Sequence, residues 1–123
     1  MNVIDTRSKA AELPDGWTSL VLGQVGSTEV KVLRMDRRPL EAESHDTAEV
    51  LLVVDGALQL TVDGSEVEVR AGEMYVVEAG VEHAVRPGSR GTLVIIERIS
   101  NPPEGTGPEC LRSVGAASEG PRP

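Results

Sequence analysis

The chain has 123 residues, enough for one domain with its own hydrophobic core but too short for two. Its 12 Lys and Arg residues against 20 Asp and Glu residues give a formal charge of −8, which disfavours binding to nucleic acid and to anionic membranes. No apolar run approaches the roughly 18 residues of a membrane span. The N-terminus lacks the apolar core of a signal peptide, and the single cysteine, Cys110, fits a reducing compartment, so we expect a cytoplasmic protein.

In chain order, the sequence predicts an N-terminal arm over residues 1–17, a β-barrel domain over 18–99 and a tail over 100–123. The arm ends in the turn-forming stretch LPDGW, with Trp17 as its anchor. The tail holds five of the eight prolines and few large aliphatic side chains, so we expect it to be flexible. Strand-like runs occupy residues 18–24, 28–35, 49–54, 57–62, 66–70, 74–78 and 92–98.

Short strands and no helical period are typical of an all-β sandwich or barrel, for which we expect about nine strands. Asp-Gly between apolar runs is the strongest short hairpin signal, and it occurs at Asp55–Gly56 and at Asp63–Gly64. The runs LLVV (51–54) and LVII (93–96) are apolar on both faces, so their outer face needs a cover. A second sheet, the N-terminal arm or another subunit would supply it, and we expect a homodimer.

Glu43, His45 and Glu49 share parity in the stretch before the run 51–54. Because strand side chains alternate, Glu43 and His45 point to one side, and Glu49 can rejoin that side after a bend. His83 closes a bend after another strand and can be the fourth member. Two imidazoles and two carboxylates suit Fe(II), Mn(II), Ni(II) or Zn(II). The alternative is a solvated charged loop whose histidines lie apart.

These stretches resemble the two motifs of the cupin superfamily of small β-barrels. ESHDTAEVLLVVDG (43–56) is similar to the first, G-x5-H-x-H-x(3,4)-E-x6-G, with Glu43 at the first histidine, His45 at the second and Glu49 at the glutamate. GEMYVVEAGVEH (72–83) is similar to the second, G-x5-P-x-G-x2-H-x3-N, with Gly72, Gly80 and His83 in register. The chain departs from the motifs at four positions, namely Arg37, Glu43, Glu78 and Pro87.

The resemblance implies a double-stranded β-helix, or jelly-roll, with a divalent transition metal held by Glu43, His45, Glu49 and His83. It implies dioxygenase or isomerase activity on a small organic molecule, without choosing between them. The acidic mouth and the scarcity of aromatic residues favour a weakly charged ligand over a sugar phosphate. The alternative is a non-catalytic sensor or accessory barrel with a degenerate metal site.

An enzyme of this kind also needs a group that moves a proton near the metal. Tyr75, Gln59 and Glu78 are the candidates. The alternative interpretation is that Tyr75 lies at the rim of the barrel and that the other two are surface residues. Cys110 lies in the predicted tail with no histidine near it in sequence, and we assign it no catalytic role.

Overall fold

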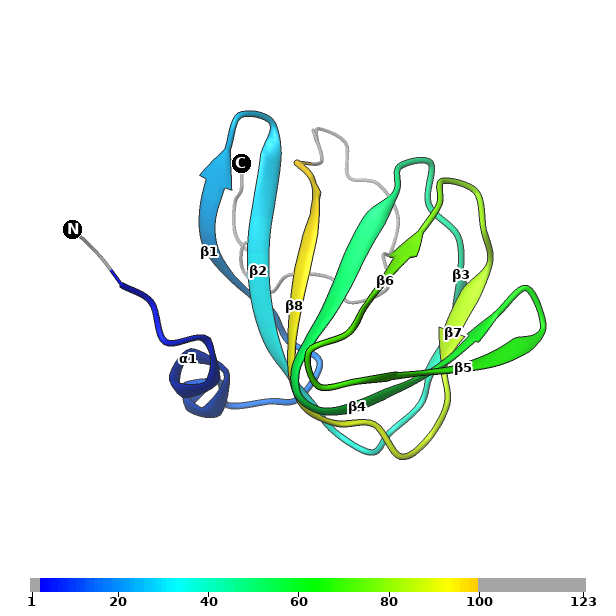
Figure 1. Ribbon diagram of the computed structural model, residues 1–123, viewed down its shortest axis with the longest axis horizontal. Coiled ribbons are helices and arrows are strands. Elements are labelled where there is room, and N and C mark those ends of the chain that lie inside the picture. Colours follow the sequence, from blue (N-terminus) through cyan, green and yellow to red (C-terminus); the bar gives the residue numbers. More distant parts are fainter. Residues whose placement is uncertain (1–2, 100–123) are drawn as a thin grey trace.

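The computed structural model describes residues 3–99, which form one short helix and eight strands (Figure 1). The predicted tail over 100–123 lies outside the described residues. The elements are α1 (Thr6–Glu12), β1 (Leu20–Val25), β2 (Thr28–Met35), β3 (Leu40–Glu43), β4 (Glu49–Val62), β5 (Ser65–Arg70), β6 (Met74–Val77), β7 (His83–Val85) and β8 (Arg90–Arg98). No helix in the described range is long and apolar enough to cross a membrane.

All strand pairs are antiparallel, in the order β1-β2-β8-β4-β7-β3, with β5 and β6 also paired to β4. Strand β4 is the centre of this arrangement. Its first half pairs with β6 and β8, and its second half pairs with β5 and β7. The sheet therefore curls on itself around β4, as Figure 1 shows, and the predicted all-β barrel of jelly-roll type is confirmed.

The two Asp-Gly pairs have different structures. Asp63–Gly64 forms the predicted hairpin turn between β4 and β5, with φ of 48° and 83°, as a type I′ turn requires. The prediction of a hairpin at Asp55–Gly56 is wrong, because the 14-residue strand β4 continues through this dipeptide. Gly56 pairs with Gly91 of β8, just after the register irregularity between Val53 and Asp55, and a Cβ on Gly56 would stand 1.9 Å from the carbonyl oxygen of Arg90. The dipeptide therefore bends a strand and does not end it.

The register irregularity of β4 between Val53 and Asp55 also switches which positions face the interior. Before it, the odd-numbered residues Leu51 and Val53 are fully buried, and after it the even-numbered Leu58 and Leu60 are. Strands β2 and β8 contribute Leu33, Met35, Leu93 and Ile95 to the same core. The barrel interior is thus filled mainly by Leu, Val and Ile, as the composition required.

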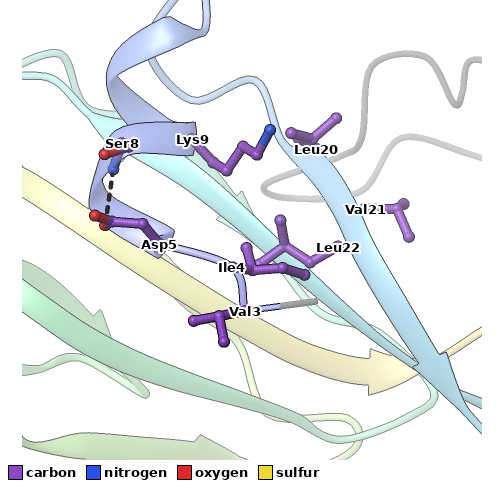
Figure 2. A pocket seen from close by; sticks show the side chains of 8 residues that line it. All are labelled: Val3, Ile4, Asp5, Ser8, Lys9, Leu20, Val21 and Leu22. Atoms are coloured by element: carbon purple, nitrogen blue, oxygen red, sulfur yellow. Dashed lines mark hydrogen bonds between the residues drawn. The ribbon is translucent and has the colours of Figure 1, made fainter. Parts of the chain in front are cut away.

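The N-terminal arm forms a helix that the sequence did not predict. Asp5 caps α1, its carboxylate accepting a hydrogen bond of 3.2 Å from the backbone N–H of Ser8. Ala10 is buried against Val32 and Val94 on the outer face of the β2–β8 sheet, so the arm supplies part of the cover that the two-sided apolar runs need. An open groove remains between the arm and β1 (Figure 2), lined by Val3, Ile4, Asp5, Ser8, Lys9, Leu20, Val21 and Leu22.

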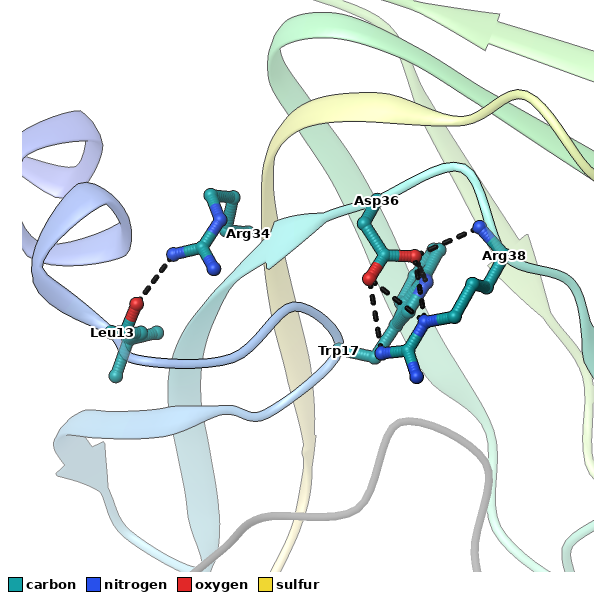
Figure 3. Close-up of polar contacts among 5 residues, drawn as sticks. All are labelled: Leu13, Trp17, Arg34, Asp36 and Arg38. Carbon is teal, nitrogen blue, oxygen red and sulfur yellow. Dashed lines mark hydrogen bonds and ion pairs between the residues drawn. The ribbon is translucent and has the colours of Figure 1, made fainter.

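Trp17 anchors the arm to the core. Its side chain is buried, it adopts a positive φ of 62°, and its indole N–H donates to Asp36 at 2.9 Å (Figure 3). The Asp36 carboxylate also accepts from the backbone and guanidinium of Arg38. Nearby, the guanidinium of Arg34 donates to the carbonyl oxygens of Ala10 and Leu13 at the end of α1. These contacts fix the helix and the turn that follows it.

Candidate metal centre

The bend in β4 brings both ends of that strand to one site. Glu49 begins β4, while Val62 ends it and pairs with His83 of β7. On the other side of β7, His83 pairs with Glu43 of β3. His45 lies in the loop between β3 and β4, and its carbonyl oxygen accepts a 2.7 Å hydrogen bond from the N–H of Gly80 in the β6–β7 turn. Two motifs that are far apart in sequence are therefore joined at one end of the barrel.

Four donor atoms converge there without hydrogen-bond partners among the described residues: Glu43 Oε1, His45 Nε2, Glu49 Oε2 and His83 Nε2. All four are buried, and the side chains of Glu49 and His83 are only 3% and 1% exposed. Leaving one buried polar atom unsatisfied costs about 1–3 kcal/mol. Four such atoms together indicate a ligand-binding site.

The hydrogen bond at the other ring nitrogen of His83 fixes its tautomer. Nδ1 lies 3.0 Å from the carbonyl oxygen of Val81, which can only accept, so Nδ1 carries a proton. Nε2 faces Glu49 Oε2 at 3.2 Å. The lone pair of a neutral ring would oppose the carboxylate there, so the site needs a cation between them or a second proton on the ring.

Without a metal, the protonated form of His83 is the cation available to the site. The Glu49 carboxylate raises the pKa of His83 above its usual value, against the opposing effect of burial, and the Val81 carbonyl and Glu43 act in the same direction as Glu49. The Nε2 and Oε2 atoms are close enough for an ion pair when the ring is protonated.

The group fits a transition metal ion. His45, Glu49 and His83 each offer one ligand atom, and these atoms lie within 4.8 Å of one another. Metal–nitrogen and metal–oxygen bonds of about 2.0–2.2 Å place the ligands of one ion up to about 4 Å apart, so small side-chain adjustments suffice. Two imidazoles and one carboxylate form the set that non-haem Fe(II) sites use, with positions left open.

Glu43 lies at the edge of this set. Its Oε1 is 3.9 Å from His45 Nε2, and its side chain is partly buried. The structure thus places Glu43 inward, at the position where the motif has a histidine, but outside the group of three donors that meet most closely. Its carboxylate can serve as a fourth ligand or accept a hydrogen bond from a bound water.

The three candidates for proton transfer have different surroundings. Tyr75 lies on the interior side of β6, half-buried against the core, opposite Leu51. Gln59 projects from the opposite face of β4 and bonds to Glu68 and Arg86, so it does not enter the barrel. Glu78 is exposed in the β6–β7 turn, where its carbonyl oxygen accepts from Val81. Tyr75 is therefore the one of the three that faces the interior.

Sequence reasoning missed a buried ion pair inside the barrel, between Lys31 of β2 and Glu97 of β8. Both residues share parity with neighbouring core residues, Lys31 with Leu33 and Glu97 with Ile95. That parity is the signal that could have placed them inside, because a charged residue at an apolar position of a strand must be paired. The groove of Figure 2 shares no residue with this pair or with the candidate metal centre.

The family described as "Cupin domain" matches residues 37–97, a range that includes all four candidate ligands. Among solved structures, the chain is similar to a cupin-2 domain containing protein from Shewanella frigidimarina, with 28% identity and a TM-score of 0.73 over 79% of this chain and 95% of that one. A protein from Neisseria meningitidis aligns with 23% identity and a TM-score of 0.69, over 80% of this chain and 100% of that one. No curated protein has a sequence that matches this chain.

A functionally described enzyme shares only the fold. Salicylate 1,2-dioxygenase from Pseudaminobacter salicylatoxidans is 16% identical with a TM-score of 0.54, over 58% of this chain and 21% of the dioxygenase. At this identity the likeness concerns the barrel alone.

Proposed function

The chain belongs to the cupin superfamily, and on that premise we propose that it binds a divalent transition metal through His45, Glu49 and His83, with Glu43 beside them, and acts on a small organic molecule. The observation that supports this most directly is the convergence of four buried donor atoms without hydrogen-bond partners among residues 3–99. An Fe, Mn, Ni or Zn ion would satisfy them together. The proposed location is the cytoplasm.

Each residue has a defined task in this proposal. The Val81 carbonyl holds His83 in the tautomer whose Nε2 lone pair points into the site. Glu49 neutralises part of the ion's charge from a fully enclosed position. When bound, such an ion polarises an oxygen of the substrate or activates O₂. The apolar barrel below the site excludes bulk water, and Tyr75 is the interior group proposed to hold or move a proton.

Dioxygenase and isomerase chemistry are the two forms of enzyme proposed, and a small, weakly charged molecule is the proposed substrate. Both need an open coordination position, whereas a binding or sensor barrel needs only a shaped pocket. The second candidate, a non-catalytic barrel without a metal, is favoured by one observation: the His83 imidazolium and Glu49 can neutralise each other directly at 3.2 Å.

The test is metal content and metal affinity of protein purified without chelators, for wild type, His83→Ala and Glu49→Gln. We expect near-stoichiometric metal in the wild type and its loss in both variants. Glu78→Gln is the matched control, because it removes an equal charge from the exposed turn next to the site. Azide added to the Co²⁺-loaded protein then shows whether a coordination position is open. A folded wild type that accepts no divalent ion would contradict the proposal and favour the metal-free barrel.

The proposed homodimer is supported by the outer face of β6. Met74 and Val76 are 60% and 40% exposed there, next to Leu52 and Val50 of β4 in the register of the sheet. A second copy would cover this face. Sedimentation of the wild type and of Met74→Glu tests it: we expect a dimer that the charge dissociates, and a monomeric wild type would refute it.

A further inference from the structure

The register of β4 and β8 places a further carboxylate beside the candidate metal centre. Glu97 is the direct antiparallel partner of Glu49. Both side chains lie on the interior face, since Glu49 continues the row of Leu51 and Glu97 continues the row of Ile95, and both of those residues are core. Directly opposed residues on one face have Cβ atoms about 5 Å apart. Glu97 is therefore within side-chain reach of an ion that Glu49 binds.

Glu97 nevertheless does not join the donor group. The three ligand atoms that meet come from His45, Glu49 and His83. The Glu97 carboxylate instead forms an ion pair with the ammonium of Lys31, which reaches it from the next strand, β2. The Lys31 side chain is 4% exposed and that of Glu97 is 21% exposed, so the pair is largely removed from water. Burial strengthens the Coulomb attraction within such a pair and makes the loss of one partner costly.

The ion pair reduces the electrostatic repulsion between Glu49 and Glu97 at this end of the barrel. Two carboxylates directly opposite each other repel, and both would be drawn to a divalent cation. With Lys31 in place, the charge of Glu97 is neutralised by an ion pair within the barrel. Removing the Lys31 charge leaves the Glu97 carboxylate free to interact with a cation that Glu49 binds.

We infer that Lys31 is a positioning residue that holds Glu97 out of the coordination sphere of an ion bound by His45, Glu49 and His83, and so keeps one coordination position open for a small oxygen-donor ligand. This inference rests on the proposed metal site. It assigns a function to a charged side chain that is buried between apolar residues of β2. It also explains how an interior with an additional carboxylate retains a site with room for a substrate.

Lys31→Met tests it, because methionine retains an unbranched apolar chain and removes the charge. Co²⁺ is the probe, since its visible absorption depends on the number and geometry of its ligands. We expect Lys31→Met to bind Co²⁺ about 10-fold more tightly, because the released Glu97 carboxylate adds a charged ligand, with a changed visible band and a weaker response to azide. The chain has two lysines, and Lys9→Met on α1 is the matched control: it makes the same change in net charge on the surface and should leave all three readouts unchanged.

Two further variants separate the possible results. Glu97→Gln should keep the wild-type band, because Glu97 is not a ligand, and should bind Co²⁺ about 10-fold more weakly, because the Lys31 charge is no longer neutralised by it. Lys31→Met combined with Glu97→Gln should restore the wild-type band. The inference is overturned if Lys31→Met has the wild-type affinity and band, or if Glu97→Gln alone changes the band. A wild type that takes up no Co²⁺ overturns the proposed function together with this inference, whereas normal uptake with an unaltered Lys31→Met overturns this inference alone.

Discussion

Gly56→Ala, in the middle of β4, should destabilise the barrel far more than the same change at Gly64 in the turn that follows β4. Gly56 has a φ of 80°, and it lies between the stretch of β4 that pairs with β6 and the stretch that pairs with β5. An added Cβ would stand 1.9 Å from the Arg90 carbonyl oxygen and 2.8 Å from the Cα of Gly91. No side-chain rotation relieves these contacts, because both are with backbone atoms.

The magnitude has two parts. Holding an alanine at positive φ costs about 1–2 kcal/mol. Separating β4 from β8 also breaks the two hydrogen bonds that Thr92 donates to the Asp55 carboxylate, at 3.0 and 3.3 Å, each of which contributes about 1 kcal/mol. Together these give a loss of about 3–4 kcal/mol in the free energy of unfolding.

The assay is urea unfolding followed by circular dichroism, with Gly64→Ala as the control. Gly64 has nearly the same φ, 83°, but a Cβ there would meet nothing within 4 Å, so only the conformational cost of about 1–2 kcal/mol applies. Equal losses of unfolding free energy in the two variants would contradict this prediction, because the backbone contact at Gly56 would then contribute nothing.

Three further predictions concern the site and the arm. In metal-free protein the raised pKa of His83 contributes stability that is fully present below the unfolded pKa of about 6.5 and is lost as pH rises through the higher folded pKa. The unfolding free energy of wild type relative to His83→Gln should therefore fall between these two pKa values and level off above them, and a difference that is flat across this range would contradict the prediction. Zn²⁺ at 100 times its dissociation constant for the wild type should stabilise the wild type by about 2.7 kcal/mol in thermal unfolding. The same Zn²⁺ concentration should stabilise Glu49→Gln by much less, and equal stabilisation of the two proteins would mean that Glu49 does not bind the ion. Arg34→Met removes the donors to the Ala10 and Leu13 carbonyls and should speed amide hydrogen exchange in α1 while the barrel strands keep their protection.

The side-chain alternation of strands made much of the site predictable. It placed Glu43 and His45 on one side and allowed Glu49 to rejoin them, and the structure brings all three beside His83. The long-range contact with His83 could not come from alternation, because it depends on barrel closure; the motif spacing supplied it. Alternation alone could not place Gln59, since the face to which it points depends on the register irregularity of β4 between Val53 and Asp55.

The Asp-Gly pairs show why local signals fail. Asp63–Gly64 is exposed, and local turn preference decides its conformation. Asp55–Gly56 has the same chemistry, but its partner Gly91 is far away in sequence, and the close approach of the two backbones determines the outcome. The helix α1 was missed for a similar reason: seven residues have little helical stability alone, and packing of Ala10 on the sheet supplies the rest.

The anchoring of Trp17 gives the protein a built-in optical probe. It is the sole tryptophan, its ring lies in the core cluster with Met35, and its N–H is bound to Asp36, so its emission reports one environment and changes when the barrel opens. Along β2, Met35 is six residues from Glu29, which pairs with Glu97 at the level of the candidate metal centre, a separation of about 20 Å. A shift in the emission of Trp17 on metal addition would therefore record a structural change that extends along the length of the barrel. A constant spectrum would show that metal binding leaves the surroundings of Trp17 unchanged.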